Sequence, residues 1–260
     1  MLPRRPVMGA FTATATQRVR EDIVRILGLR SPFTMITGFD RPNLSFDVQK
    51  PKDKTAALVK FIRSRTDKSG IVYCATRAAV DKLYEELTKR GVSAAKYHAG
   101  MEDAERAEQQ EDFSYDRKTV MIATNAFGMG IDKSNVRWII HYNMPKSIES
   151  FYQEIGRAGR DGLPSETLLF FNVQDLIVLR NFAEESVQKD INNERLNRMQ
   201  EYAEARVCRR RILLNYFGEI TDRACCNCDV CHTPPQYFDG TIIVQQALSA
   251  IKRCNESIGI

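Results

Sequence analysis

The chain has 260 residues, of which 43% are hydrophobic, so it can bury the core of one large or two modest domains. Its net charge of +5 and isoelectric point near 8.8 permit an anionic partner without requiring one. The sequence has no apolar run of about 18 residues and no apolar core of a signal peptide, so we predict a cytoplasmic chain without a membrane span. In that reducing compartment, its seven cysteines are expected to bind metal or pack in the core rather than form disulfides.

The first predicted elements are a short strand over the apolar run 6–11, a polar turn over 12–16 and a helix over 17–27, which Gly28 ends. No earlier strand in the sequence is available to pair with this strand. We therefore expect the chain to begin inside a domain whose body is absent. None of the 14 glycines precedes a lysine, as a phosphate-binding P-loop requires, and no Asp precedes a Glu as in a magnesium-binding acidic box.

Strand and helix patterns then alternate, which is typical of an α/β domain with a parallel sheet. The predicted strands are 44–48, 70–74, 94–97, 120–122, 136–140 and 168–171. The predicted helices are 54–65, 77–90, 103–113, 147–155 and 176–182. The final third lacks strand patterns, and we expect it to be helical and held together by a metal ion.

Polar residues or glycines follow three of the predicted strands. They are Thr76 and Arg77, His98 and Gly100, and Thr124 and Asn125. Because parallel strands end at one edge of a sheet, these positions are expected to form one groove, and residues 124–132 and 143–146 are expected at the same edge. Such a groove contacts phosphates rather than bases, so its binding is salt-dependent. The structural alternatives are a capping threonine with a solvated arginine, and a histidine that only packs.

Two arginines lie three residues apart directly after the predicted helix 147–155. Arg157 and Arg160 each follow a glycine, so the backbone can bend to point both guanidiniums the same way. Guanidinium is always charged and bonds phosphate oxygens in a fork, which favours a polyphosphate ligand. The alternative is a surface turn whose arginines pair with Glu154 or Asp161.

The cysteine pattern is the strongest purely chemical signal. Cys225, Cys228 and Cys231 are spaced so that one tight loop can bring three thiolates to a tetrahedral ion. Cys208, on a helix predicted over 202–217, can supply a fourth. Four thiolates select zinc or an iron–sulfur cluster over hard cations.

Two further residues compete for the fourth ligand position. Cys226 and His232 are each disfavoured because an adjacent residue is already a candidate ligand. The three arginines at 209–211 cannot all share one helix face, and contact with DNA or pairing with Glu204 and its neighbours are alternatives for them. A last amphipathic helix is predicted over 244–258.

Several of these blocks resemble known motifs. Residues 153–162 resemble the sixth motif of superfamily 2 helicases, and residues 123–133 look like the fifth. The sequence FTATAT at 11–16 looks like the third motif, and Thr76 with Arg77 looks like the fourth. Together they resemble a RecQ-family DNA helicase over nearly the whole chain.

This resemblance implies a RecA-like α/β lobe, with a parallel sheet flanked by helices, followed by a small helical zinc-binding subdomain. We expect residues 1–36 to be the tail of a first RecA-like lobe and residues 37–185 to be the second lobe. Residues 186–240 would be the zinc-binding subdomain, and residues 241–260 the start of a winged-helix domain.

The resemblance also implies roles for individual residues. Arg160 is the expected arginine finger, with Arg157 beside it, and Gly130 and Asp132 are expected near the ATP ribose and the contact between lobes. The groove residues are expected to bind the backbone of single-stranded DNA. The RecQ zinc-binding domain holds structural zinc through four cysteines, here Cys208, Cys225, Cys228 and Cys231. Cys226 stands where a glycine is usual, and Cys225 is preferred over it as the ligand.

The implied function is part of an ATP-dependent DNA helicase that unwinds duplex DNA with 3′-to-5′ polarity in recombination and repair. ATP and magnesium would be shared with the missing first lobe, so the chain alone is expected not to hydrolyse ATP. The expected partners are single-stranded DNA and duplex junctions, the first lobe, and single-strand DNA-binding proteins. A bacterial protein of this kind would associate with the nucleoid.

Two other classes remain as alternatives. The missing P-loop favours a non-enzymatic module, natural or truncated, that binds DNA or a protein partner. A zinc-dependent redox or regulatory protein is disfavoured because nothing in the sequence resembles an open metal position.

Overall fold

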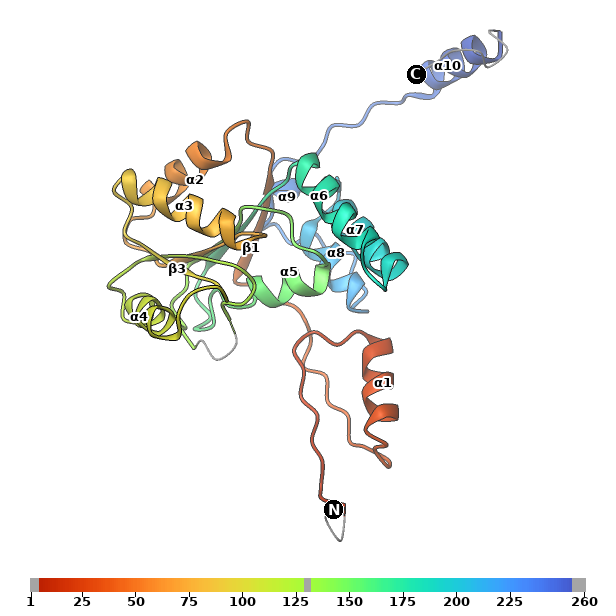
Figure 1. Ribbon diagram of the computed structural model, residues 1–260. Helices are drawn as coiled ribbons and strands as arrows, with labels where there is room; N and C mark the ends of the chain where they lie inside the picture. The colour runs from red at the N-terminus through yellow and green to blue at the C-terminus, as the bar shows by residue number, and fades with distance from the viewer. Residues whose placement is uncertain (1–4, 129–131, 254–260) are drawn as a thin grey trace.

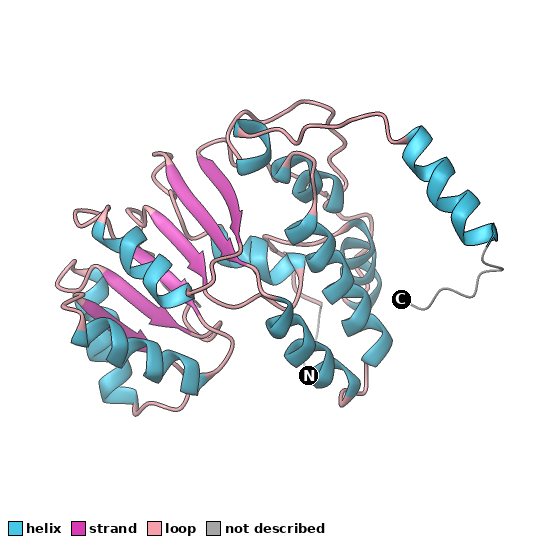
Figure 2. Ribbon diagram, turned by 90° about the horizontal axis from the view of Figure 1, so that it is seen from above, coloured by secondary structure: helices cyan, strands magenta, loops and turns pink. Residues whose placement is uncertain are grey.

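The computed structural model describes residues 5–128 and 132–253. Its centre is one six-stranded, fully parallel sheet in the order β1-β6-β5-β2-β4-β3, whose strands lie side by side in Figure 2. The strands are β1 (Leu44–Gln49), β2 (Gly70–Tyr73), β3 (Ala94–Tyr97), β4 (Val120–Ala123), β5 (Trp138–His141) and β6 (Ser165–Phe170). The sheet confirms the predicted α/β fold.

Helices cover both faces of the sheet (Figure 1). The first six are α1 (Gln17–Ile26), α2 (Lys54–Arg63), α3 (Arg77–Lys89), α4 (Asp103–Ser114), α5 (Ile148–Ile155) and α6 (Val173–Glu184). They are followed by α7 (Lys189–Glu204), α8 (Arg209–Tyr216), α9 (Asp229–His232) and α10 (Thr241–Arg253). The helical final third was predicted correctly.

The core consists of two clusters, one on each face of the sheet. Alternate side chains of β2 divide between them: Val72 joins the cluster under α2 and α3, and Ile71 joins the cluster under α5, α7 and α8. Every residue of β2, β4 and β5 is buried. This two-sided burial explains why the strands were recognisable as short continuous apolar runs.

Two predicted elements differ from the structure. Residues 6–11 form no strand, because no neighbouring strand pairs with them among the described residues. The helix predicted over 202–217 is broken, since α7 ends at Glu204 and α8 begins at Arg209. Ala205 is extended and Cys208 is non-helical, and this break turns the Cys208 side chain toward the other cysteines.

The ends of the described chain lie away from the sheet. Neither α1 nor α10 contains a buried residue, and α10 is separate from the other helices in both views (Figures 1 and 2). The predicted continuation of α10 to residue 258 falls outside the described residues. Within 5–128 and 132–253, no helix is long and apolar enough to cross a bilayer.

Candidate functional site

The predicted groove residues follow three strands that are neighbours in the sheet. β2, β4 and β3 are adjacent, so the segments after them share one edge. Thr76 caps α3 by accepting a hydrogen bond from the backbone N–H of Ala79, and Arg77, which begins the helix, is exposed. The N–H of Thr124 donates to the carbonyl of Tyr97, which ties two of these segments together. The amino end of α3 therefore presents backbone N–H groups and positive dipole at this edge.

His98 is buried and both of its ring nitrogens are engaged. Its Nδ1 accepts from the N–H of Gly100 at 3.1 Å, so Nε2 carries the proton and donates to Asp81 at 3.2 Å. Burial raises the pKa of Asp81, but hydrogen bonds from Lys96 and His98 lower it below the ordinary value. In the structure His98 thus holds the loop after β3, and its direct contact with nucleic acid stays a prediction.

Asn143 lies at the same edge, as predicted for residues 143–146. Its side-chain oxygen accepts from the N–H of Ala75, and its amide donates to Asp175. Asp175 also pairs with Lys54 at 2.7 Å between mostly buried side chains. This network ties β5 to β2 next to Thr76.

The two arginines lie on a turn held at the end of α5. Ser147 caps this helix as predicted, accepting from the N–H of Ser150. The turn after it places Gly159 at a φ of +57°, a left-handed conformation that glycine adopts without steric cost. Arg157 donates to the carbonyl of Gly128, and Arg160 lies 3.5 Å from the carboxylate of Asp132.

The acidic residues suggested as alternative partners of the arginines have other contacts. Glu154 is buried against Nε2 of His141 at 2.7 Å, and Asp161 pairs with Arg137. His141 therefore links β5 to α5 in addition to packing, a role that its strand position alone did not indicate.

A cavity of about 520 Å³ lies beside this turn. Arg157 and Arg160 line it together with Arg20, Arg41 and the segment 12–15. The structure thereby joins the sixth and third helicase-like motifs at one cavity, although they are more than a hundred residues apart in the sequence. Asp132 is exposed next to Arg160, and Gly130 lies outside the described residues.

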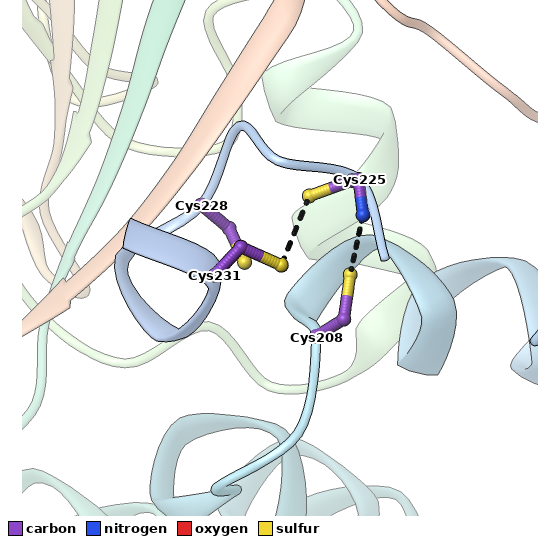
Figure 3. A group of neighbouring side chains, drawn as sticks. All are labelled: Cys208, Cys225, Cys228 and Cys231. Atoms are coloured by element: carbon purple, nitrogen blue, oxygen red, sulfur yellow. Dashed lines mark hydrogen bonds between the residues drawn. The ribbon is translucent and has the colours of Figure 1, made fainter. Parts of the chain in front are cut away.

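The four predicted metal ligands come together (Figure 3). The sulfurs of Cys208, Cys225, Cys228 and Cys231 all lie within 4.8 Å of one another, and those of Cys225 and Cys231 are 3.9 Å apart. A zinc ion with four sulfurs at about 2.3 Å requires sulfur–sulfur distances of about 3.8 Å. The side chains therefore fit a closed tetrahedral zinc site.

Burial and nearby N–H donors act on the pKa values of the thiols in this cluster. Burial raises the pKa of Cys225 to about 12. Burial also opposes ionisation of Cys208, but N–H donors from Arg211 and Cys225 lower its pKa to about 7. A bound dication favours the thiolate form of all four, which is the form that ligates metal.

The competing ligands lie outside this group. Cys226 is exposed and adopts a φ of +51°, while Nε2 of His232 contacts the carbonyl of Cys226. The left-handed backbone at Cys226 turns the loop so that Cys225 and Cys228 face the same point. It also explains why a glycine suits this position.

The neighbouring arginines each pair with an acidic side chain in the described chain. Arg209 is buried and forms two bonds to Asp229, and Arg211 pairs with Asp222. Arg210 is also buried and pairs with Asp40. The acidic partners are therefore Asp229, Asp40 and Asp222 rather than Glu204, and contact of these arginines with DNA stays a prediction. Sequence reasoning missed Arg41, Asn43 and Arg210 as supports of the site, because their partners are carbonyls more than a hundred residues away.

Comparisons with known proteins agree with this geometry. Residues 53–162 match the helicase conserved C-terminal domain, and residues 173–232 match the RecQ zinc-binding domain. The chain is 44% identical to "ATP-dependent DNA helicase RecQ" of Pasteurella multocida, over 99% of its own length and 41% of that protein. It is 43% identical to the protein of that name from Bacillus subtilis, over 98% and 44% of the two lengths.

The fold also resembles that of a solved structure. Dbp5 of S. cerevisiae, bound to RNA and ADP BeF3, superposes with a TM-score of 0.61 at 20% identity, over 93% of this chain and 54% of that one. At this identity the likeness concerns the RecA-like fold alone. The chain spans about two fifths of the length of the curated relatives it matches. The chain belongs to the RecQ family and contains its conserved C-terminal helicase domain followed by its zinc-binding domain.

Proposed function

We propose that this chain is the second RecA-like lobe and zinc-binding subdomain of an ATP-dependent DNA helicase. The relatives that share its sequence are named as such, but the chain covers less than half of each. The observation that carries the proposal is the arginine turn, which faces a cavity shared with segment 12–15. The 3′-to-5′ polarity and the roles in recombination and repair are part of this proposal.

In the proposed reaction, Arg160 stabilises the charge that develops on the transferred phosphoryl group of ATP, and Arg157 assists beside it. A residue of this kind contributes roughly 10³ to 10⁵ in rate. Arg160 suits the role because it is partly exposed, with 37% of its side chain accessible, at the cavity. Asp132 and Gly130 would lie near the ribose and the contact between lobes.

The edge formed after β2, β4 and β3 would bind the backbone of single-stranded DNA. Thr76, Arg77, Thr124 and Asn125 supply polar groups there, and the loop of His98 and Gly100 borders them. A notional Cβ on Gly100 would lie 3.1 Å from the Arg77 side chain, so the two segments are in contact. Phosphate contacts of this kind are largely independent of base sequence.

Zinc would be structural. Cys208 and the loop with Cys225, Cys228 and Cys231 would hold the ion with four thiolates, which leaves no coordination position for substrate. The ion would supply cross-linking between the start of α8 and the loop 225–231. A backbone hydrogen bond also holds the loop 225–231 against the sheet, since the N–H of Phe46 donates to the carbonyl of Asn227.

ATP binding would close a first RecA-like lobe onto this one, and hydrolysis would release it. The contacts with the DNA backbone would then shift along the strand. ATP, magnesium and that lobe are therefore proposed partners, together with duplex junctions and single-strand DNA-binding proteins. The same proposal includes domain boundaries at residues 36, 185 and 240. It also includes a cytoplasmic, nucleoid-associated location.

A non-enzymatic DNA-binding or partner-binding module is the second candidate, because this sequence lacks a Gly-Lys pair for a P-loop. The first test is ATP hydrolysis by the zinc-loaded chain, with and without single-stranded DNA. In parallel, the chain is joined to the amino-terminal part of the Bacillus subtilis relative. We expect no turnover from the chain alone and DNA-stimulated turnover from the joined protein. DNA binding without turnover in the joined protein would favour the second candidate.

A further inference from the structure

One short segment, residues 39–44, lies between the arginine turn and helix α8 of the zinc-binding part. Its carbonyls accept from α8 on one side, and its side chains donate to the turn on the other. We propose that Arg41 is a positioning residue for the turn that holds Arg157 and Arg160, and that Arg210 fixes Arg41 from the zinc-binding part. The functional half of this inference rests on the role proposed above for Arg160.

Arg41 binds the backbone of the turn directly. Its Nη1 donates to the carbonyl of Gly156 at 3.4 Å, and its Nη2 donates to those of Ala158 and Gly159, each at 3.0 Å. These carbonyls follow the last turn of α5, where helical partners are missing and the helix dipole is negative. A cation with several donors in one plane meets this requirement, and Arg41 thereby fixes the backbone on both sides of Arg157.

Asn43 holds the far side of the same turn. Its amide donates to the carbonyls of Gly159 at 2.9 Å and Leu163 at 3.0 Å. The N–H of Gly159 in turn donates to the carbonyl of Val136. Arg160 therefore follows a turn whose backbone is held by segment 39–44 and by Val136, which lies just before β5. Misplacement of a catalytic group by about 1 Å can cost on the order of 100-fold in rate.

Arg210 fixes segment 39–44 itself. Its buried guanidinium donates to the carboxylate of Asp40 at 2.5 Å and to the carbonyls of Arg41 and Leu44, each at 2.6 Å. It also lies over the ring of Phe46. Because Arg210 binds the carbonyl of Arg41, it sets where the Arg41 side chain begins.

Aromatic packing strengthens the same junction. Phe39 stacks on Phe217, with ring centroids 4.5 Å apart and planes at 11°, and its N–H donates to Glu219. Tyr152 of α5 donates to the carbonyl of Phe39. A continuous set of contacts therefore runs from Cys208, two residues before Arg210, through segment 39–44 to the arginine turn. The proposed positioning of the turn by Arg210 and Arg41 acts through these contacts.

The test compares Arg41→Lys with the unchanged zinc-loaded chain by hydrogen–deuterium exchange. An ammonium cannot bond three carbonyls in one plane, but it keeps the charge. We expect amides of residues 156–163 to exchange about tenfold faster, because one or two hydrogen bonds are lost locally. Amides of β2 and β4 are expected not to change. Arg63→Lys is the control, because Arg63 is exposed and its bond is to the carbonyl of Arg90.

The functional part of the test uses the joined protein described above, in which this chain follows the amino-terminal part of the Bacillus subtilis relative; it is called the full-length form from here on. We expect Arg41→Lys and Arg210→Lys to lower kcat for ATP by about 10- to 100-fold while KM changes less than about threefold. Unchanged exchange at 156–163, equal acceleration in the core strands, or unchanged kcat would each overturn the positioning role. Full ATP hydrolysis by Arg160→Ala would instead reject the arginine-finger role of Arg160. In that case the hydrogen–deuterium exchange result alone would test whether Arg41 holds the turn.

Discussion

Gly128 and Arg157 are in direct contact, and the contact leaves no room for a side chain at position 128. Arg157 donates to the carbonyl of Gly128, and a Cβ on Gly128 would lie 2.0 Å from Nη2 of Arg157. The segment after β4 and the turn after α5 therefore meet through one guanidinium, at the cavity proposed for nucleotide.

Replacing this glycine is expected to displace the arginine. In Gly128→Ala the methyl group would push away the flexible end of Arg157, so the fold is kept while the guanidinium moves. We expect ATP hydrolysis by the full-length form to fall by about 10- to 100-fold, with the free energy of unfolding lowered by about 1 kcal/mol. Gly162→Ala is the control, since its φ of +81° also strains the backbone of an alanine while no atom lies within 4 Å of its notional Cβ. Equal hydrolysis by both variants would contradict the proposed importance of the contact.

Arg160→Ala is expected to abolish hydrolysis in the full-length form while retaining ATP binding. The residue would act on charge that develops only in the transition state, so kcat should fall by roughly 10³-fold or more. Single-turnover kinetics and nucleotide affinity, measured on the same preparation, separate the two effects. Retained DNA-stimulated turnover would exclude the finger role.

Zinc binding distinguishes Cys225 from Cys226. We expect Cys225→Ser to lose zinc and to become sensitive to protease over 205–235, because structural zinc contributes on the order of 10 kcal/mol to local folding. Cys226→Gly should keep one zinc per chain. It should be neutral or more stable by up to about 1 kcal/mol, because glycine adopts the left-handed conformation seen at φ +51° without strain. Metal analysis and thermal unfolding check both; zinc loss in Cys226→Gly would reverse the assignment.

Asp116 links the segment after β4 to the sheet by accepting from Lys133 at 2.7 Å, and from Ser69 and Asn135. Burial raises the pKa of Asp116, but these hydrogen bonds lower it below the ordinary value of 3.8. Because the folded pKa lies below the unfolded one, Asp116 stabilises the fold above the ordinary pKa, and this contribution is lost as pH falls through the folded pKa.

Asp116→Asn should therefore lower stability at pH 7, by less than about 1 kcal/mol because solvent screens the half-exposed carboxylate, and the difference from the unchanged chain should close below about pH 4. Asparagine suits the position because it tolerates the positive φ of 60° found there. Urea unfolding at pH 7 and at about pH 3 measures the difference in the free energy of unfolding. A difference of the same size at pH 3 would show that the effect does not come from the ionised carboxylate.

Much of this protein was determined by local sequence patterns. The strands are short apolar runs because both sheet faces are covered, and Ser147 caps α5 where its position predicts. Arg157 and Arg160 stand out because glycines precede them, and Cys225, Cys228 and Cys231 because their spacing suits one loop. Each of these signals lies within a few residues, so periodicity, capping and ligand spacing reveal it.

Only the tertiary structure decided how these pieces meet. The break that frees Cys208 from a continuous helix follows from the demands of the cysteine cluster and of Arg209. Arg41 reaches carbonyls 117 residues away, and Arg210 reaches a carbonyl 166 residues away. Backbone carbonyls are the same for every residue type, so no local pattern identifies the partner of such an arginine; the packing of sheet and helices brings the two together.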